Sequence, residues 1–536
     1  MKIFSMFVNK SFFDDTFGKY AIIITVVFCV AITFVSTNYS PFLNSENALF
    51  YYFPGTEILQ GNVKDVIIPN ATYFNAILFA LTSQPFVHMK IISILSGTGI
   101  VFFTYLITKQ IFNSKIAILS TLFISIYAGL HLHSYLVQTD IFPIFLLFVS
   151  FYFITKPNIN QNNIILLSIF LGLSFMLKYQ AGIIGIGFLI FFIFFTKPRL
   201  KNCLLFLLVS LLVVSPLLIF NYTYTEEIFT SNSSYLILME WKNIPSEWYE
   251  DDSYNDSLLL LRNPELFVNN FGNNLYHTSV DTILNLKWSF NNLSIFPLIP
   301  ILGIIPLFGG MYFVRSSIPR NFIPLIIGFS VYVPIMCIFA SVTNPIRLFP
   351  PALILIILCA IFFSKINKKY LLIAILICII FVNLMASEIM ANWVLYENDS
   401  YRFWENKENH KIEEYNIGMM LSKEENIEEK YVMAQSNIIP YYANSKFIRD
   451  FVTITKNDTM DLSKKPLGSL EQHITRENWK QYDIYTSNFY SHPQKENEQI
   501  RIPDYFVSEP QENVPENWIL IYQSEKFEVY KIHKKE

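Results

Sequence analysis

Long apolar stretches fill most of the first 390 residues, and they constrain the fold more than any other feature of the sequence. A helix that crosses a membrane needs about 20 mostly apolar residues, because lipid offers no hydrogen-bond partner to an unpaired backbone amide. Eleven stretches approach this length, at 20–37, 89–110, 115–133, 141–156, 163–178, 180–196, 203–221, 293–313, 321–341, 348–364 and 370–390. We therefore predict a polytopic α-helical membrane protein with about 11 transmembrane helices.

Charge divides the chain into two parts. Residues 1–390 contain 38 charged side chains, whereas the 146 residues from 391 to 536 contain 43. This predicts a transmembrane domain over 1–390 and a soluble domain over 391–536, and it excludes a purely soluble protein. The net charge of −3 and the lack of a basic patch in the polar part give no electrostatic basis for binding nucleic acid. The five cysteines all lie in apolar stretches and suggest neither disulfides nor a zinc site.

The orientation in the membrane follows from the basic residues of the short loops, which favour the cytoplasmic side. With a cytoplasmic N-terminus, 14 of the 21 Lys and Arg residues of the first part fall inside, and Asp14 and Asp15 are the acids that do so. The opposite orientation would invert both biases. We thus expect a multi-pass protein of the cell membrane whose loops 38–88 and 222–292 and C-terminal domain are extracytoplasmic.

The polar C-terminal part is typical of an α/β domain. A charged helical stretch covers about 405–430. Short strand-like runs follow, separated by polar or Pro-containing breaks, at Tyr431–Gln435, Phe447–Ile454, Tyr482–Ser487, Tyr505–Ser508, Trp518–Gln523 and Phe527–Ile532. This part contains no phosphate-binding glycine loop, zinc motif or nucleophile elbow. We therefore expect it to be a binding or shaping domain rather than the part that contains the catalytic residues.

Four charged residues lie near the external ends of the predicted spans, where charge is costly and is therefore a functional hypothesis by default. They are Glu46, Asp140, Lys178 and Arg347. Two cations at similar depth can hold a phosphate, and a carboxylate can take a proton from a hydroxyl. The alternative is that each residue reaches the interface or forms a structural pair. His131 and His133 are poor joint metal ligands, because residues two apart point to different faces of a helix.

These features resemble the polytopic class C glycosyltransferases, which use polyprenyl-phosphate sugars and include protein O-mannosyltransferases and the aminoarabinose transferases of lipid A. The resemblance covers roughly residues 20–365 in order. It is carried by Glu46 with Tyr51-Tyr52 and Leu59-Gln60-Gly61, a surface helix at 73–84, Thr139-Asp140, Gly172-Leu173 followed by Lys178, and Arg347 with Pro350-Pro351.

The resemblance implies roles for individual residues. Glu46 would be the catalytic base, at a position where the family more often has Asp, frequently as Asp-Glu. Asp140 would be the second catalytic acid. Lys178 and Arg347 would lie near the lipid phosphate or its sugar, with Lys64 a weaker third candidate.

The predicted activity is therefore that of an inverting membrane glycosyltransferase. It would move a sugar from a polyprenyl-phosphate donor to an acceptor hydroxyl of a protein, glycan or lipid on the external face. No cofactor is implied with certainty, and we predict no metal ligands; a divalent metal is not favoured. Two alternatives stay open, namely a transporter or flippase of lipid-linked sugars and an inactive relative that acts as a binding component.

Overall fold

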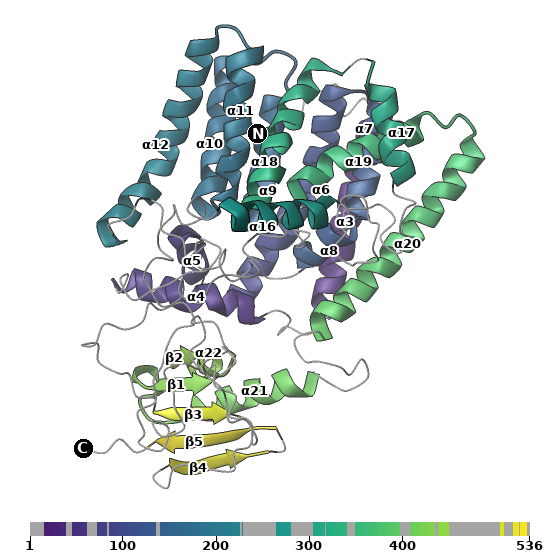
Figure 1. Ribbon diagram of the computed structural model, residues 1–536. Helices are drawn as coiled ribbons and strands as arrows, with labels where there is room; N and C mark the ends of the chain where they lie inside the picture. Colours follow the sequence, from purple (N-terminus) through teal and green to yellow (C-terminus); the bar gives the residue numbers. More distant parts are fainter. Residues whose placement is uncertain are drawn as a thin grey trace.

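The computed structural model describes fifteen stretches of the chain. They are residues 16–38, 45–61, 72–82, 85–135, 140–225, 228, 264–279, 304–316, 318–339, 349–396, 408–434, 438–449, 504–508, 518–524 and 526–532. A bundle of helices fills one half of the molecule, and a small sheet lies at the opposite end (Figure 1). Of the predicted site positions, Lys64 and Arg347 lie outside the described residues, and Glu46 is described by its backbone alone.

Helices account for the first part of the described chain. Their bounds are α3 (Thr16–Asn38), α4 (Ser45–Leu59), α5 (Tyr73–Ala80), α6 (Pro85–Ile111), α7 (Ser114–Ser125), α8 (Ala128–Tyr135), α9 (Ile141–Ile154), α10 (Gln161–Leu177), α11 (Gln180–Phe195), α12 (Arg199–Thr225), α16 (Pro264–His277), α17 (Ile304–Val314), α18 (Ile323–Phe339), α19 (Phe349–Ser364) and α20 (Lys369–Tyr396). A 3-10 turn, η3 (Arg320–Phe322), precedes α18.

Each of the eleven predicted spans contains a described helix. Among the described residues, four helices are long and apolar enough to cross a membrane, at Thr16–Phe34, Val87–Ile111, Arg199–Tyr224 and Arg320–Ile338, and seven others are shorter apolar helices. The stretch predicted at 115–133 is divided into α7 and α8. At this break the His131 ring donates to the carbonyl of Ser125, 2.6 Å away, in place of a backbone amide. The mostly helical, multi-pass fold is confirmed, while the number of crossings stays a prediction.

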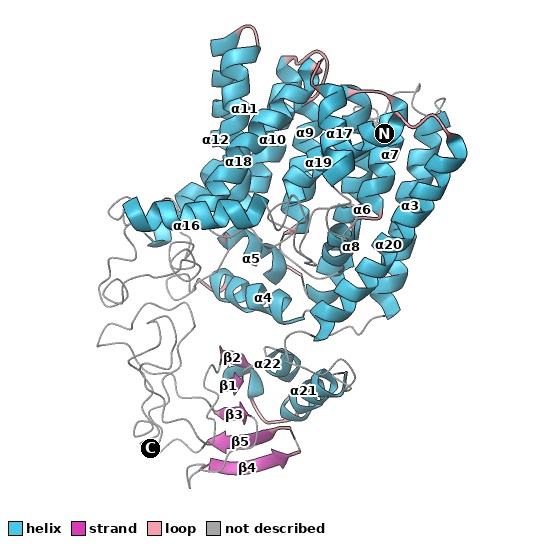
Figure 2. Ribbon diagram, turned by 45° about the vertical axis from the view of Figure 1, so that its right-hand side comes forward, coloured by secondary structure: helices cyan, strands magenta, loops and turns pink. Residues whose placement is uncertain are grey.

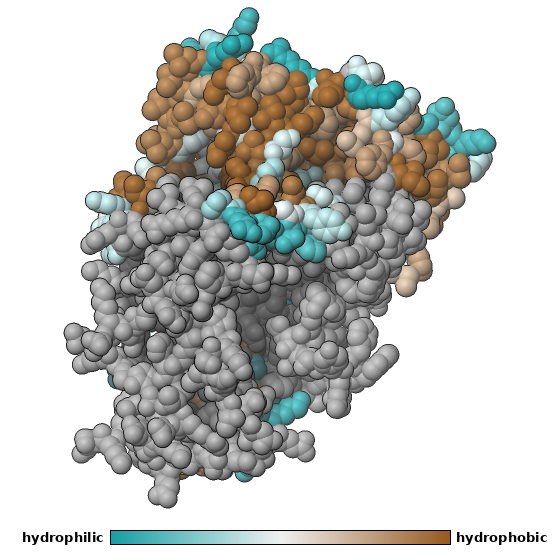
Figure 3. All heavy atoms as spheres, viewed as in Figure 1, coloured by the Kyte–Doolittle hydropathy of each residue, from teal (hydrophilic) through white to brown (hydrophobic). Residues whose placement is uncertain are grey.

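The bundle packs around one continuous apolar core. Phenylalanine rings interlock in it, as where Phe151 meets Phe188 and Phe329 edge to face. Small residues let two backbones meet, because a Cβ on Gly187 of α11 would lie 2.5 Å from the Cα of Gly328 on α18. Outward faces are also apolar, and Figure 3 shows hydrophobic residues over most of the visible bundle with hydrophilic residues at its free edge. This is the surface that lipid would cover.

Hydrogen bonds join the loops that carry basic residues at one end of the bundle. Arg320 donates to the carbonyl of Phe195 at 2.7 Å, and Lys115 donates to that of Ser364 at 2.6 Å. Gln110 joins two further connections, because its carbonyl accepts from Asn321 and its side-chain oxygen from Thr155. Loops far apart in the sequence thus share the end that faces away from the sheet (Figure 1).

The C-terminal part contains a five-stranded sheet in the order β2-β1-β3-β5-β4. The strands are β1 (Tyr431–Ala434), β2 (Lys446–Arg449), β3 (Tyr505–Ser508), β4 (Trp518–Gln523) and β5 (Glu528–Ile532). Pairing is parallel among β2, β1 and β3 and antiparallel among β3, β5 and β4. Four of the six predicted strands are confirmed within a residue at their ends. The run predicted at Phe447–Ile454 is a strand over its first three residues, and its remainder and the run Tyr482–Ser487 lie outside the described residues.

Two helices pack on one face of this sheet, and the side chains of its strands alternate between the two faces. Ile417 and Leu421 of α21 (Glu408–Leu421) and Ile439 of α22 (Ile438–Ala443) share a buried cluster with Val432 and Val507. The other face has its own cluster, which includes Met433, Phe506 and Trp518. The short 3-10 turn η4 (Ile427–Glu429) leads from α21 into β1.

Three helices lie between the bundle and the sheet. Figure 2 shows α4, α5 and α16 across the end of the bundle that faces the sheet. α4 and α5 pack on one another, and α16 packs on α18. The Asn274 side chain of α16 donates to the carbonyl of Cys337 at 3.1 Å, near the end of α18, where backbone carbonyls lack helical partners. This layer separates the apolar helices from the polar C-terminal part.

Candidate functional site

An ion pair between Asp140 and Lys178 lies at the end of the bundle that faces the sheet. The Nζ of Lys178 contacts the carboxylate of Asp140, and the two side chains are 13% and 19% exposed. Asp140 immediately precedes α9, and Lys178 immediately follows α10. The two charges that the sequence placed at similar depth are therefore direct partners.

The ends of α9 and α10 are fixed against each other beside this pair. The hydroxyl of Ser174 on α10 donates to the carbonyl of Pro143 on α9 at 2.8 Å. Pro143 lies in the first turn of α9, where a missing amide costs no helical hydrogen bond. Lys178 then leaves the helix with extended backbone angles (φ −154°, ψ 118°), and its amide still donates to Ser174 at 2.9 Å. These contacts fix the position of the Lys178 backbone.

The N-terminus of α5 sits on the last turn of α10. The Thr72 hydroxyl donates to the carbonyl of Met176, and the side-chain amide of Asn75 donates to that of Leu177 at 3.2 Å. Thr72 also caps α5, because its hydroxyl accepts the amide of Asn75 at 3.3 Å. Both polar side chains are buried. The carbonyls at the end of α10, which lack helical partners, thus accept hydrogen bonds from side chains at the start of α5, next to Lys178.

Helix α4 is attached to α5 through a close backbone approach. A Cβ on Gly55 would lie 2.1 Å from the carbonyl oxygen of Ala76, so a larger residue cannot occupy this position without displacing one helix. Ile58, Tyr73 and Ala76 bury a small apolar cluster around this contact. Glu46 belongs to the first turn of α4. α5 therefore links the helix that carries Glu46 to the helix end that carries Lys178.

Tyr179 and Asn221 lie on the other side of Lys178. The side-chain amide of Asn221 on α12 donates to the hydroxyl oxygen of Tyr179 at 3.1 Å and to the carbonyl of Ile228 at 2.9 Å. Phe220 packs against Tyr73 of α5 with ring centroids 5.6 Å apart. The chain around Lys178 is therefore held from both α5 and α12.

The structure adds polar residues that the sequence prediction did not include: Thr72, Asn75, Ser174, Tyr179 and Asn221. Thr72 could have been recognised, because a Thr directly before a helical stretch is a preferred capping residue. The others are unremarkable in the sequence, since their hydrogen bonds reach residues from 31 to 102 positions away.

Metal binding receives no support from the described part of the chain. No group of three or more His, Cys, Asp or Glu side chains gathers there to hold an ion. His131 is engaged with the Ser125 carbonyl and packs against Phe28, with ring centroids 5.5 Å apart. The prediction of catalytic and phosphate-binding roles for Glu46, Asp140, Lys178, Arg347 and Lys64 stays a prediction.

The C-terminal part touches the layer that covers the site. Tyr441 of α22 meets Tyr52 of α4 edge to face, with ring centroids 5.6 Å apart. Burial, followed by the neighbouring Tyr52 and Tyr442 side chains, raises the pKa of Tyr441 to about 12. The helix that carries Glu46 is therefore in contact with the C-terminal part on the side away from the bundle.

Comparisons with known proteins agree with this architecture. Residues 68–220 match the model of a family described as dolichyl-phosphate-mannose-protein mannosyltransferase. A search of curated protein sequences found no match. The segment matched by the family model contains both Asp140 and Lys178.

Solved structures share the fold at low sequence identity. ArnT from Cupriavidus metallidurans bound to undecaprenyl phosphate is 12% identical with a TM-score of 0.53, covering 95% of this chain and 97% of ArnT. Its apo state gives 11% identity, a TM-score of 0.52 and the same coverage. An Archaeoglobus fulgidus oligosaccharyltransferase tethered with an acceptor peptide gives 13% identity and a TM-score of 0.50, over 80% of this chain and 63% of that chain. The resemblance predicted from the sequence is confirmed at the level of the fold.

Proposed function

We propose that this chain, whose fold resembles that of the polytopic class C glycosyltransferases, is a membrane glycosyltransferase with a polyprenyl-phosphate sugar as its donor. The acceptor would present a hydroxyl group, on a protein, a glycan or a lipid. The active site would lie where α9, α10 and α5 meet, between the bundle and the C-terminal part.

The Asp140–Lys178 ion pair is the observation that carries this proposal. A buried ion pair adds little stability over a well-packed apolar pair, because both charges lose their hydration. The presence of such a pair at the end of an apolar bundle therefore favours a functional role. Both residues lie in the segment that matches the family model.

The pair is suited to receive a lipid phosphate. An ammonium group has three donors, so Lys178 can keep Asp140 and still bind phosphate oxygens. Asp140 would hold the lysine charge in place before the donor arrives. Arg347 would supply bidentate contacts to the same phosphate, and Lys64 would be a third cation.

Glu46 would act as the general base. The acceptor oxygen attacks the anomeric carbon while the bond from that carbon to the phosphate oxygen breaks, and Glu46 takes the hydroxyl proton. The polyprenyl phosphate leaves with the bonding electrons, and the cations stabilise its charge. A single displacement inverts the anomeric carbon.

The proposed membrane orientation places this chemistry outside the cytoplasm. The basic connections gather at the end of the bundle away from the sheet, and basic loops favour the cytoplasmic side. α4, α5 and the C-terminal part would then face the exterior of the cell membrane, where the acceptor would be held.

Transfer from a labelled polyprenyl-phosphate sugar to a hydroxyl acceptor, measured with the purified full chain, tests the proposal. Wild-type protein should release polyprenyl phosphate and label the acceptor, whereas Glu46→Gln should bind the donor without turnover. Glu57→Gln, at the other end of α4, is the matched control and should retain transfer.

Two outcomes would overturn the proposal. Movement of the labelled lipid across proteoliposomes without transfer would indicate a flippase. Donor binding without turnover by the wild-type chain would indicate a binding component. Full activity of Glu46→Gln would remove Glu46 as the base.

A further inference from the structure

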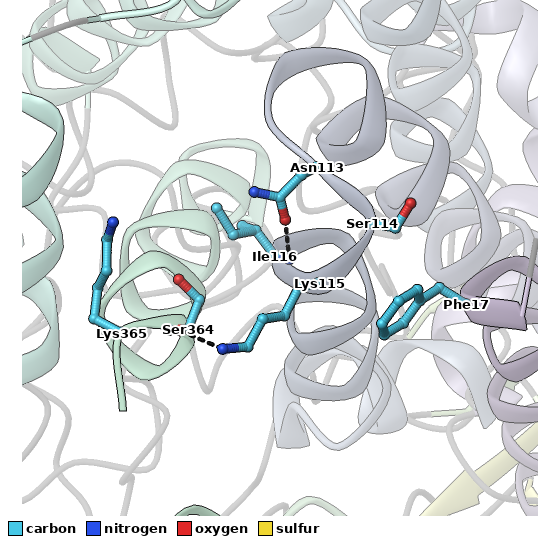
Figure 4. Close-up of a pocket in the computed structure, with 7 residues that line it drawn as sticks. All are labelled: Phe17, Asn113, Ser114, Lys115, Ile116, Ser364 and Lys365. Carbon is cyan, nitrogen blue, oxygen red and sulfur yellow. Dashed lines mark hydrogen bonds between the residues drawn. The ribbon is translucent and has the colours of Figure 1, made fainter. Parts of the chain in front are cut away.

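A cavity of about 630 Å³ opens at the end of the bundle away from the sheet. Three elements line it: Phe17 lies in the first turn of α3, Asn113 to Ile116 form the start of α7, and Ser364 ends α19 with Lys365 directly after it. Figure 4 shows Lys115 between Ser364 and Phe17, with Lys365 on the far side of Ser364. The cavity lies at the opposite end of the bundle from the Asp140–Lys178 pair, so the proposed function does not use it.

The cavity is positively charged without a described counter-charge. Lys115 and Lys365 are both exposed. Up to residue 396, the Asp and Glu residues among the described stretches are Glu46, Glu57, Asp140, Glu265 and Glu388, all on elements that reach the other end. The first turn of α7 and the last residue of α19 both line the cavity, so helix ends of opposite dipole sign face it and the two lysines supply its net charge. An anion is the ligand that this field favours.

Both lysines are held in place yet keep donors available. Lys115 donates to the carbonyl of Ser364 at 2.6 Å, which leaves two of its three N–H groups for a ligand. The Nζ of Lys365 lies 5.8 Å from the ring centroid of Phe313. Asn113 accepts the amide of Ile116 at 3.0 Å and so fixes the first turn of α7. The cavity is therefore formed before any ligand arrives.

Its surroundings match the headgroup layer of a membrane. Tyr20, Tyr312 and Tyr370 are exposed around this end of the bundle, and tyrosines of this kind gather at membrane interfaces. The Arg315 guanidinium stacks on Tyr312 at 4.0 Å. Phe17 is exposed and begins the lipid-facing side of α3, which continues through Ile23. An acyl chain can follow that side while a phosphate occupies the cavity.

We propose that this cavity is a binding site for an acidic glycerophospholipid of the membrane leaflet at the end away from the sheet. The phosphate and the second anionic or hydroxyl-rich group of the lipid would lie between Lys115 and Lys365. The acyl chains would pack on Phe17 and α3. Basic pockets between membrane helices are a recurring site for acidic lipid headgroups.

Titration of the purified full chain in neutral detergent with phosphatidylglycerol tests this proposal, with thermal stability and native mass spectrometry of bound lipid as readouts. Each lysine near a lipid surface changes affinity by about fivefold. Lys365→Gln should weaken phosphatidylglycerol binding about fivefold, and the double variant Lys115→Gln/Lys365→Gln should weaken it further. Lys365→Gln keeps the Lys115–Ser364 bond, so it separates lipid binding from loss of that helix contact.

The matched control is Arg199→Gln/Lys201→Gln, which removes two exposed charges from the start of α12 at the same end of the bundle. This variant should bind phosphatidylglycerol like the wild type. Equal weakening in both double variants would overturn the proposal in favour of diffuse attraction. Equal binding of phosphatidylcholine would overturn the requirement for an acidic lipid. Equal stabilisation by glycerol phosphate or inorganic phosphate would show that the cavity binds a small anion rather than a lipid.

Discussion

Lys178 and Asp140 pair across the junction of α9 and α10, although 37 residues of mostly apolar chain separate them. The contact joins the residue after one helix to the residue before another, so a shift of either helix breaks it. Each charge also lies mostly out of contact with solvent. The stability of this part of the bundle and the state of the proposed site therefore depend on the same two side chains.

Removing one member of the pair should destabilise the protein more than removing both. Lys178→Met leaves the partly buried Asp140 carboxylate without its partner, which costs up to about 3 kcal/mol of the free energy of unfolding. Lys178→Met/Asp140→Leu should recover most of that loss and still lack transfer. Denaturant unfolding and a transfer assay on the same preparations measure both effects. A double variant with wild-type transfer would contradict the proposed role of the pair.

Thr72→Val should weaken the junction of α5 with α10. It removes the cap of α5 and the bond to the Met176 carbonyl, at a cost of about 1–2 kcal/mol. We also expect a lower kcat, since the link between α4 and Lys178 passes through α5. Thr82→Val is the control: its hydroxyl donates to Phe79 at 2.7 Å within its own helix end. Equal losses in both variants would contradict a special role for Thr72.

Gly55→Ala should force α4 and α5 apart. The added Cβ would lie 2.1 Å from the Ala76 carbonyl oxygen, a distance that real contacts do not show. The expected result is lower thermal stability and loss of transfer. Gly272→Ala, on α16, is the matched control, since a Cβ there meets nothing within 4 Å. That control should raise helix stability by up to about 1 kcal/mol. Unchanged activity in Gly55→Ala would show that α4 can move without consequence.

Tyr52 and Tyr441 should show a measurable coupling. An edge-to-face aromatic pair contributes about 0.5–1.5 kcal/mol beyond its area burial. A double-mutant cycle with Tyr52→Leu and Tyr441→Leu should give a coupling in this range, measured by proteolytic opening of the full chain. Tyr442 is the comparison residue, because its ring meets Tyr415 at 4.7 Å. A cycle of Tyr52 with Tyr442 should give no coupling; equal couplings would contradict a specific contact.

The C-terminal sheet should lose stability in acid through Glu424. A hydrogen bond from Tyr505 and the nearby Lys531 ammonium, 3.0 Å away, lower the pKa of the Glu424 carboxyl. The unfolded chain then binds more protons than the folded chain between the lowered and the ordinary pKa, so the free energy of unfolding rises with pH in that window. The contribution is complete above the ordinary carboxyl pKa and disappears as the pH falls through the lowered one.

Glu424→Gln should flatten this acid limb of the stability curve. Burial and the Glu424 hydrogen bond both raise the pKa of Tyr505, which keeps its hydroxyl protonated as the donor throughout the acid range. Glu425→Gln removes the same charge from an exposed neighbouring position and is the control. Thermal unfolding from pH 3 to 7 separates the two variants. An unchanged acid slope in Glu424→Gln would show that other groups control the transition.

Local pattern was enough to locate the apolar helices and most of the strands. Hydropathy over about 20 residues does not depend on neighbours in space, so the apolar stretches that became α9, α10 and α11 were readable from the sequence within a few residues. The alternation of side chains similarly located β3 and β5. Hydropathy also singled out Asp140 and Lys178, because a charged residue at the end of an apolar helix is rare and its transfer into the membrane costs free energy.

The sequence alone therefore located the apolar helices, most of the strands and the charged residues at helix ends, but not α16 or α22. The tertiary structure decided which of these groups meet: Lys178 pairs with Asp140, Thr72 seats α5 on α10, and β3 lies between β1 and β5. It also divided the stretch at 115–133 into two helices, where the His131 ring donates a hydrogen bond to the carbonyl of Ser125. Such pairings depend on packing between distant segments, and hydropathy, a property of each segment alone, does not encode them.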